Sequence, residues 1–102
     1  MIYSVSGKLQ LKKNSYAVIE TGGLGYKVSV SLNTYKNLPE VGGNVTLMTH
    51  FHVREDDMSL YGFLEERELN LFELLLSVSG IGPKTALNIL SAAPVDRLTG
   101  AI

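Results

Sequence analysis

The chain has 102 residues, 45% of them hydrophobic, and a formal net charge of −1. This length and composition suit one globular domain, or one domain plus part of another, and argue against a disordered chain. The absence of cysteine excludes disulfides, thiol catalysis and cysteine-ligated zinc. No apolar run approaches the length of a membrane span, and the strand-like start does not match a signal peptide. We therefore expect a cytoplasmic protein.

The first 63 residues predict a small β-barrel. Alternation of apolar and polar side chains predicts strands at residues 2–13, 16–21, 26–32, 45–53 and 58–63. Gly7 interrupts the first strand where a bulge or bend is expected. A turn is expected at residues 22–25, and Asn33-Thr34 can cap one helical turn that runs through Leu38. Five short strands favour the five-stranded OB-fold, with an open β-sandwich as the alternative.

From Leu64 onward the hydrophobic period becomes helical. One face of the first helix carries Leu69, Phe72, Leu75, Leu76 and Val78. A second helix is expected from Pro83 through Leu90, and a third begins at residues 94–98 and is cut short by the chain end. We therefore expect two domains, a barrel at residues 1–63 and a truncated helical domain at residues 64–102.

The segment between the first two of these helices resembles the helix-hairpin-helix motif. Gly80 can adopt positive φ and end the preceding helix, Ile81 can fill the angle between the helices, and Gly82 permits close approach of another molecule. Pro83 suits the first helical turn, whose free N–H groups and neighbouring Lys84 can bind an anion such as a DNA phosphate. The predicted DNA-backbone contacts are Ser79, Gly80, Ile81, Gly82, Pro83, Lys84 and Thr85. The alternative is an ordinary αα-hairpin with a glycine turn.

An acidic stretch joins the last two predicted strands, at Glu55, Asp56 and Asp57. Acidic residues suit a solvated turn, and consecutive carboxylates do not converge on one ion as a spaced metal-binding loop does. Arg54 precedes the stretch and can contact phosphate or pair with an acid; both interpretations stay open. His50 and His52 share one strand face but lack an evident third zinc ligand, so no metal site is predicted.

The whole chain resembles the N-terminal half of the RuvA family, bacterial proteins that bind Holliday junctions. The matching residues are Glu20-x-Gly22-Gly23-x-Gly25-Tyr26, Leu38-Pro39, Thr49-His50-Phe51-x-Val53-Arg54-Glu55-Asp56, Leu60-Tyr61-Gly62-Phe63, Leu71-Phe72 and Gly80-x-Gly82-Pro83-Lys84-x-Ala86-x-x-Ile89-Leu90-Ser91. The resemblance covers nearly all of the chain in one register.

This resemblance implies a DNA-binding scaffold for branch migration in recombination and repair. Proteins of this family combine an OB-fold, a middle domain with two helix-hairpin-helix motifs and a C-terminal domain that recruits the RuvB ATPase. They assemble as tetramers, sometimes paired as octamers, on a four-way junction that the RuvC resolvase also acts on. The resemblance also implies that Glu55 and Asp56 form an acidic pin, which Asp57 extends and which repels phosphates at the junction centre. The second hairpin and the RuvB-binding domain are not expected in this chain.

No catalytic or cofactor-binding motif is present in the sequence, which has neither a P-loop nor a dinucleotide fingerprint. ATP hydrolysis would therefore belong to a partner. Two other functions stay open: single-strand binding by aromatic residues of the barrel, and a structural oligomerisation module. The candidate aromatic residues are Tyr3, Tyr16, Tyr26 and Phe51. A net charge of −1 is unusual for a DNA-binding protein, but the lysines and the acids lie in separate parts of the chain.

Overall fold

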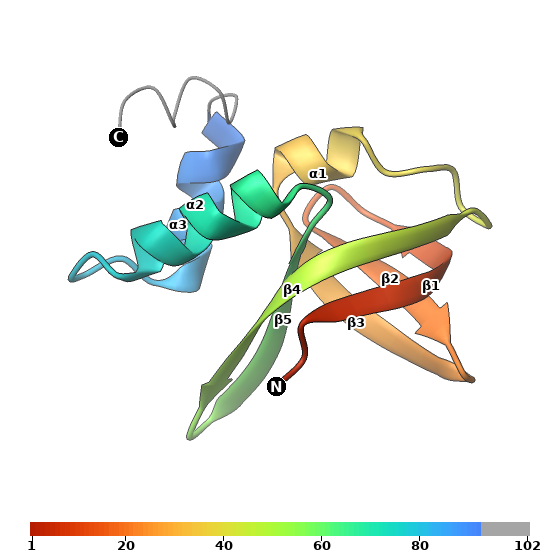
Figure 1. Ribbon diagram of the computed structural model, residues 1–102, viewed down its shortest axis with the longest axis horizontal. Coiled ribbons are helices and arrows are strands. Elements are labelled where there is room, and N and C mark those ends of the chain that lie inside the picture. Colours follow the sequence, from red (N-terminus) through yellow and green to blue (C-terminus); the bar gives the residue numbers. More distant parts are fainter. Residues whose placement is uncertain (93–102) are drawn as a thin grey trace.

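The computed structural model describes residues 1–92, which contain five strands and three helices (Figure 1). Their bounds are β1 Ser4–Lys12, β2 Tyr16–Thr21, β3 Leu24–Val30, α1 Leu32–Lys36, β4 Asn44–Arg54, β5 Asp57–Phe63, α2 Glu66–Leu76 and α3 Pro83–Ala92. All five predicted strands are present, with ends shifted by a residue or two at most. The predicted third helix, at residues 94–98, lies outside the described residues.

The strands close into a barrel in the order β1-β2-β3-β5-β4. β1 takes part on both sides of the closure, because its first half pairs with β4 and its second half pairs with β2. Neighbouring strands are antiparallel except β3 and β5, which are parallel. This closed arrangement confirms the predicted OB-fold barrel over the open sandwich.

The sequence predicted a bulge or a bend at Gly7, but the bulge in β1 lies further along the strand. The register between β1 and β2 shifts between Leu9 and Leu11, which places the bulge at that point. Gly7 is needed for a different reason: a Cβ there would lie 2.3 Å from the carbonyl oxygen of Glu20. The missing side chain lets β1 and β2 approach where β1 passes from one partner strand to the other.

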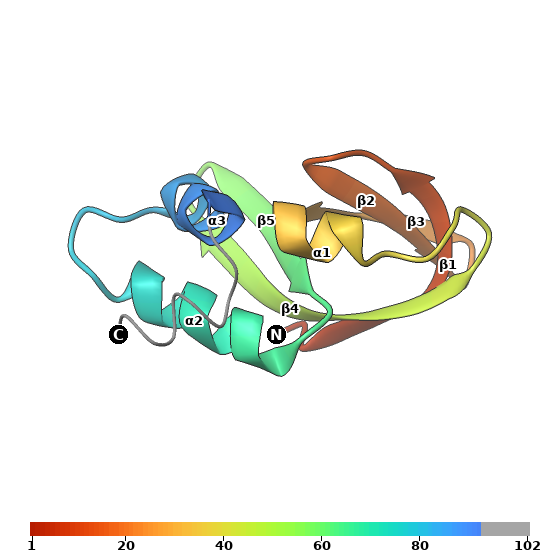
Figure 2. The same ribbon diagram turned by 90° about the horizontal axis from the view of Figure 1, so that it is seen from above.

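The second half of β5, residues 60–63, is buried on both faces and so belongs to two hydrophobic cores. Leu60 points into the barrel core, whereas Tyr61 and Phe63 point outward and pack under α2 and α3. The ring of Phe72, from α2, lies 5.1 Å from the ring of Phe63 and 5.3 Å from that of Tyr61, measured between centroids. The buried residues of this second core are Tyr61, Phe63, Leu69, Leu71, Phe72, Ala86 and Leu90. Both helices therefore lie beside β4 and β5, at one end of the molecule (Figure 2).

A buried carboxylate joins α2 to the start of α1. Glu68 is only 3% exposed, and its two oxygens accept hydrogen bonds from Ser31 Oγ at 2.6 Å and Thr34 Oγ1 at 2.8 Å. Ser31 Oγ also accepts the backbone N–H of Thr34, which caps α1. The cap predicted at Asn33-Thr34 is therefore wrong, because the hydroxyl two residues earlier takes that role.

The helical segments differ from the prediction at two further points. α2 ends at Leu76 with Ser77 as its C-cap, so the prediction that Gly80 ends this helix is wrong. Val78 lies beyond that end and is 49% exposed, whereas Leu71, absent from the predicted apolar face, is buried. The turn predicted at residues 22–25 is shorter, because β3 already begins at Leu24. No helix within residues 1–92 is long and apolar enough to cross a membrane.

Replacing Glu68 by alanine should lower the free energy of unfolding by roughly 2–3 kcal/mol, because the buried hydroxyls of Ser31 and Thr34 would lose their acceptor. Urea denaturation followed by circular dichroism measures the change. Glu66→Ala, at an exposed position two residues closer to the start of α2, is the matched control and should be nearly neutral. Equal losses in the two variants would contradict the role given to Glu68.

Candidate nucleic-acid interface

A short turn connects α2 and α3 and sets the angle between them. Ser77 and Val78 donate backbone hydrogen bonds to the last carbonyls of α2, and Ile81 N–H donates to Val78 O at 3.1 Å. Gly80 has φ of +87°, which confirms the predicted positive φ at this position. Ile81 packs against the second core, as expected of a residue that fills the angle between two helices.

The first turn of α3 presents unpaired backbone donors. Pro83 is the first residue of α3, and the first helical hydrogen bond runs from Ala86 N–H to Gly82 O at 2.9 Å. The N–H groups of Lys84 and Thr85 therefore have no helical acceptor. Both of these residues are exposed, and a Cβ added at Gly82 would meet no atom within 4 Å. The backbone here is accessible to a ligand, and the helix dipole and the ammonium group both favour an anion.

The acidic stretch forms the tip of the β4–β5 hairpin, which projects from the barrel (Figure 1). The turn is tighter than predicted, because Arg54, the last residue of β4, pairs with Asp57, the first residue of β5, and only Glu55 and Asp56 lie between them. All four residues are exposed. Arg54 Nε donates to His52 Nε2 at 3.0 Å, so its bonded neighbour is a histidine of its own strand.

The tip of the β4–β5 hairpin and the start of α3 face each other across a groove of about 330 Å³. Its strand side carries residues His52, Arg54, Asp56, Asp57 and Tyr61, and its helix side carries residues Gly82, Pro83, Lys84 and Thr85. The fold thus brings together the two motifs that the sequence singled out separately. Glu55, Ser79, Gly80 and Ile81 do not line this groove, and the first three are exposed beside it.

Tyr61 is a candidate contact that the sequence analysis did not single out. Burial raises the pKa of its phenol, and the charge of Asp57 raises it further, while the hydrogen bond from Ser59 and the charge of Arg54 act in the opposite direction. The phenol is therefore protonated at neutral pH and can donate to a phosphate oxygen. The available signal was the run from Leu60 to Phe63, whose uninterrupted apolar character is typical of a strand buried on both faces.

The two histidines of β4 make hydrogen bonds within the protein. His50 Nδ1 lies 2.9 Å from Glu73 Oε2, and the His50 ring lies edge-on to Phe72. His52 accepts the hydrogen bond from Arg54. Within residues 1–92 no group of three or more histidine, aspartate or glutamate side chains is placed to hold a metal ion.

A closed five-stranded barrel followed by two helices with a glycine turn defines the class, an OB-fold protein with a helix-hairpin-helix region. The family model "RuvA N terminal domain" matches residues 1–62, and the model "SAM-like Helix-hairpin-helix tandem" matches residues 72–100. Because the first match covers more than half of the chain, the chain belongs to the RuvA family. The resemblance drawn from the sequence is thereby confirmed.

Curated relatives agree with this assignment. The chain is 45% identical over 102 residues to the Holliday junction branch migration complex subunit RuvA of Acetivibrio thermocellus, covering all of this chain and 50% of that protein. The subunit of the same name from Prosthecochloris aestuarii is 49% identical over 96 residues, 94% of this chain and 48% of its own length. The one from Syntrophotalea carbinolica is 50% identical over 102 residues, all of this chain and 51% of its own length. The chain thus spans about half the length of these relatives.

Two glycine substitutions in the connecting turn should differ in their effect on folding. Gly80→Ala should lower the free energy of unfolding by about 1–2 kcal/mol, because alanine is strained at positive φ. Gly82→Ala should leave stability unchanged or raise it slightly, because the added methyl meets no atom and the unfolded chain loses entropy. Thermal unfolding of the two variants beside the unaltered chain measures the difference. A larger loss for Gly82→Ala would contradict this account of the turn.

Proposed function

We propose that this chain is the junction-binding half of a RuvA-family protein, a non-catalytic scaffold that binds four-way DNA. The observation that carries the proposal is the groove in which the tip of the β4–β5 hairpin faces the start of α3. Attractive and repulsive groups for phosphate face each other there. Such an arrangement can favour one path of the DNA strands over another, so it suits recognition of DNA shape rather than of base sequence.

The attractive side is the helix-hairpin-helix segment. Residues 79–85 bind the sugar–phosphate backbone, chiefly through the free N–H groups of Lys84 and Thr85 and the ammonium group of Lys84. Gly82 supports this role because it leaves space over the backbone that no atom of the described chain fills. Arg54 and Tyr61, on the facing strands, are further donors to the same phosphates.

The repulsive side is the acidic pin at Glu55, Asp56 and Asp57. These exposed carboxylates stand at the tip of a projecting hairpin, so they can reach DNA without any change in the barrel. Carboxylates held near phosphates raise the free energy of a bound strand, and the strand is thereby steered away from the pin. In the assembled protein the pins of several subunits would meet at the junction centre and hold the exchanging strands apart.

The proposal also covers the oligomer and the partner proteins of the full-length protein. The unit at residues 1–63 and the helical unit at residues 64–102 act together as one subunit of a homotetramer, two of which can pair as an octamer. The full-length protein recruits the RuvB ATPase, which supplies the motor for branch migration, and works beside the RuvC resolvase in recombination and DNA repair in the cytoplasm. These partners would be engaged by parts of the protein beyond this chain.

Single-strand binding by the barrel has less support in the arrangement of its aromatic residues. Tyr26 and Phe51 pack against the barrel core, and the ring of Tyr16 lies under the ammonium group of Lys27 at 4.6 Å. Stacking of bases needs an open ring face. Of the candidate rings, Tyr3 is the most exposed, at 66%.

In a gel-shift titration at low salt, the chain should bind a four-way junction more tightly than a linear duplex with the same arm sequence. Gly82→Ala should weaken junction binding about tenfold, a loss of about 1.4 kcal/mol, because the methyl group would separate the backbone from the phosphate. Unchanged thermal stability of the variant is the control. Equal affinity of the unaltered chain for both DNAs would count against the proposal.

Reversing two charges of the pin, with Glu55→Lys and Asp56→Lys together, should tighten binding to both DNAs and reduce the preference for the junction. The matched control reverses Glu65 and Glu66, which are also exposed, so the net charge changes equally at a place outside the groove. Fluorescence anisotropy with both DNAs measures the two affinities. Identical behaviour of the two double variants would show that overall charge, and not the pin, sets the preference.

A further inference from the structure

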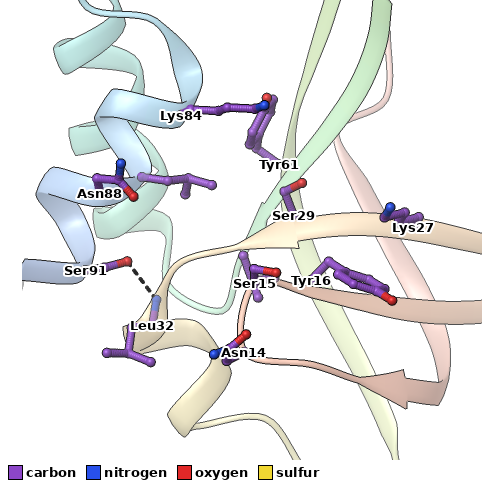
Figure 3. Close-up of a pocket in the computed structure, with 12 residues that line it drawn as sticks. Asn14, Ser15, Tyr16, Lys27, Ser29, Leu32, Tyr61, Lys84, Asn88 and Ser91 are labelled. Atoms are coloured by element: carbon purple, nitrogen blue, oxygen red, sulfur yellow. Dashed lines mark hydrogen bonds between the residues drawn. The ribbon is translucent and has the colours of Figure 1, made fainter.

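A second and larger groove runs on from the first between the barrel and α3. It has a volume of about 650 Å³, and it shares Tyr61 and Lys84 with the first groove (Figure 3). Its described lining residues are Asn14, Ser15, Tyr16, Lys27, Ser29, Val30, Leu32, Tyr61, Lys84, Leu87, Asn88 and Ser91. A ligand that lies against the start of α3 can therefore continue along the barrel without leaving a concave surface.

The barrel side of this groove is formed by side chains that lie next to one another on three neighbouring strands. Tyr16 of β2 pairs with Ser29 of β3, and Ser29 is in register with Tyr61 of β5. Lys27 lies two residues before Ser29 and therefore on the same outer face of β3, whereas the intervening Val28 is buried in the barrel core. Polar side chains from distant parts of the chain thus form one outward-facing surface opposite α3.

The helix side is one face of α3. Lys84, Leu87, Asn88 and Ser91 follow one another at the three- and four-residue spacing that places side chains on the same side of a helix. At the far end Ser91 Oγ accepts the backbone N–H of Leu32 at 3.0 Å, and this bond holds α3 against the barrel (Figure 3). Ser91 and Leu32 both line the groove, so this bond joins its helix side to its barrel side.

The charge of this groove differs from that of the first. Both charged residues that line it are lysines, and none of its described lining residues is acidic. Lys27 Nζ lies 4.6 Å from the centre of the Tyr16 ring, a cation–π contact that holds the ammonium group in place while leaving its N–H donors available. Serine and asparagine side chains add hydroxyl and amide groups to the lining, and Val30, Leu32 and Leu87 supply apolar surface. Two lysines and neutral donors suit successive phosphates of one nucleic-acid strand.

We propose that this second groove is a continuation of the DNA-backbone track and that Lys27 is a phosphate contact. The inference rests on the proposed function, because the strand enters the groove from the start of α3. Lys84 stands where the two grooves meet, and Lys27 binds a phosphate further along the same strand. Tyr16 is a positioning residue that holds Lys27. Because the Lys27 ammonium covers the Tyr16 ring, the contact is to the backbone and carries no base preference.

The test compares the salt dependence of junction binding for Lys27→Gln, Lys84→Gln and a control, Lys8→Gln. Lys8 is an exposed strand lysine that lines neither groove. Fluorescence anisotropy with a labelled four-way junction is measured over a series of KCl concentrations. Loss of one phosphate contact should reduce the slope of log K against log salt by about 0.9 per binding chain for Lys27→Gln and likewise for Lys84→Gln. Lys8→Gln should leave the slope unchanged.

Two further variants separate the role of charge from that of shape. Lys27→Arg should keep the slope of the unaltered chain, because the positive charge stays over the Tyr16 ring. The double variant Lys27→Gln/Lys84→Gln should lose about twice the slope of either single variant, as two separate phosphate contacts require. Circular dichroism spectra and melting temperatures show that all variants are folded.

The outcomes distinguish DNA binding by the helical hairpin from DNA binding along the second groove. If Lys84→Gln reduces the slope while Lys27→Gln behaves like Lys8→Gln, the hairpin binds DNA and the second groove does not. If the unaltered chain binds no junction, the proposed function fails and the inference fails with it. Reduced slopes for both single variants, with additive loss in the double variant, support a track that includes Lys27.

Discussion

Burial of the second half of β5 on both faces is the constraint on which the rest of the structure depends. Leu60 faces the barrel core, and Tyr61 and Phe63 form the floor on which α2 and α3 pack. β5 also carries Asp57 at its start, next to the tip of the β4–β5 hairpin. One strand therefore links the acidic turn, the barrel and the helical hairpin, and the packing on its outer face sets how the two candidate DNA-contacting elements face each other.

Hydrogen bonds near the end of β5 further fix the positions of α2 and α3 against the barrel. Glu68 accepts from Ser31 and Thr34, and Ser91 accepts from Leu32. Both connections reach the start of α1, which directly follows β3. Since buried polar groups need partners, a shift of either helix would leave a carboxylate or a hydroxyl unsatisfied. The polar contacts thus restrict the helices to one position on a hydrophobic floor that by itself would permit sliding.

The charge distribution explains how a chain with a net charge of −1 can present a surface for DNA. The lysines that line the grooves are Lys27 and Lys84, while the acids of α2 lie elsewhere and those of the pin stand at one end. A bound phosphate interacts mainly with nearby charges, because salt screens exposed charges beyond roughly 10 Å. Total charge is therefore a poor guide to the local charge of the two grooves.

Local patterns in the sequence predicted the parts of this protein whose cause is local. The alternation of apolar and polar residues predicted the strands, and Gly80, Gly82 and Pro83 predicted the turn before α3. The positive φ at Gly80 depends only on the geometry of that turn. Predictions that needed knowledge of neighbouring segments were less accurate. A bulge or a bend was predicted at Gly7, whose constraint is the carbonyl of Glu20 on another strand. The cap of α1 was predicted at Asn33-Thr34, whereas Ser31 caps the helix.

The sequence by itself determined the strand and helix order, the hairpin motif, the acidic turn and the family. Only the tertiary structure decided that the acidic turn and the start of α3 line one groove, that Glu68 is buried and that Lys27 and Lys84 line a second groove. The physical reason is distance along the chain. Periodicity reports which face of an element is apolar, but which elements meet depends on packing between segments far apart in sequence, and that is decided when the second core closes over β5.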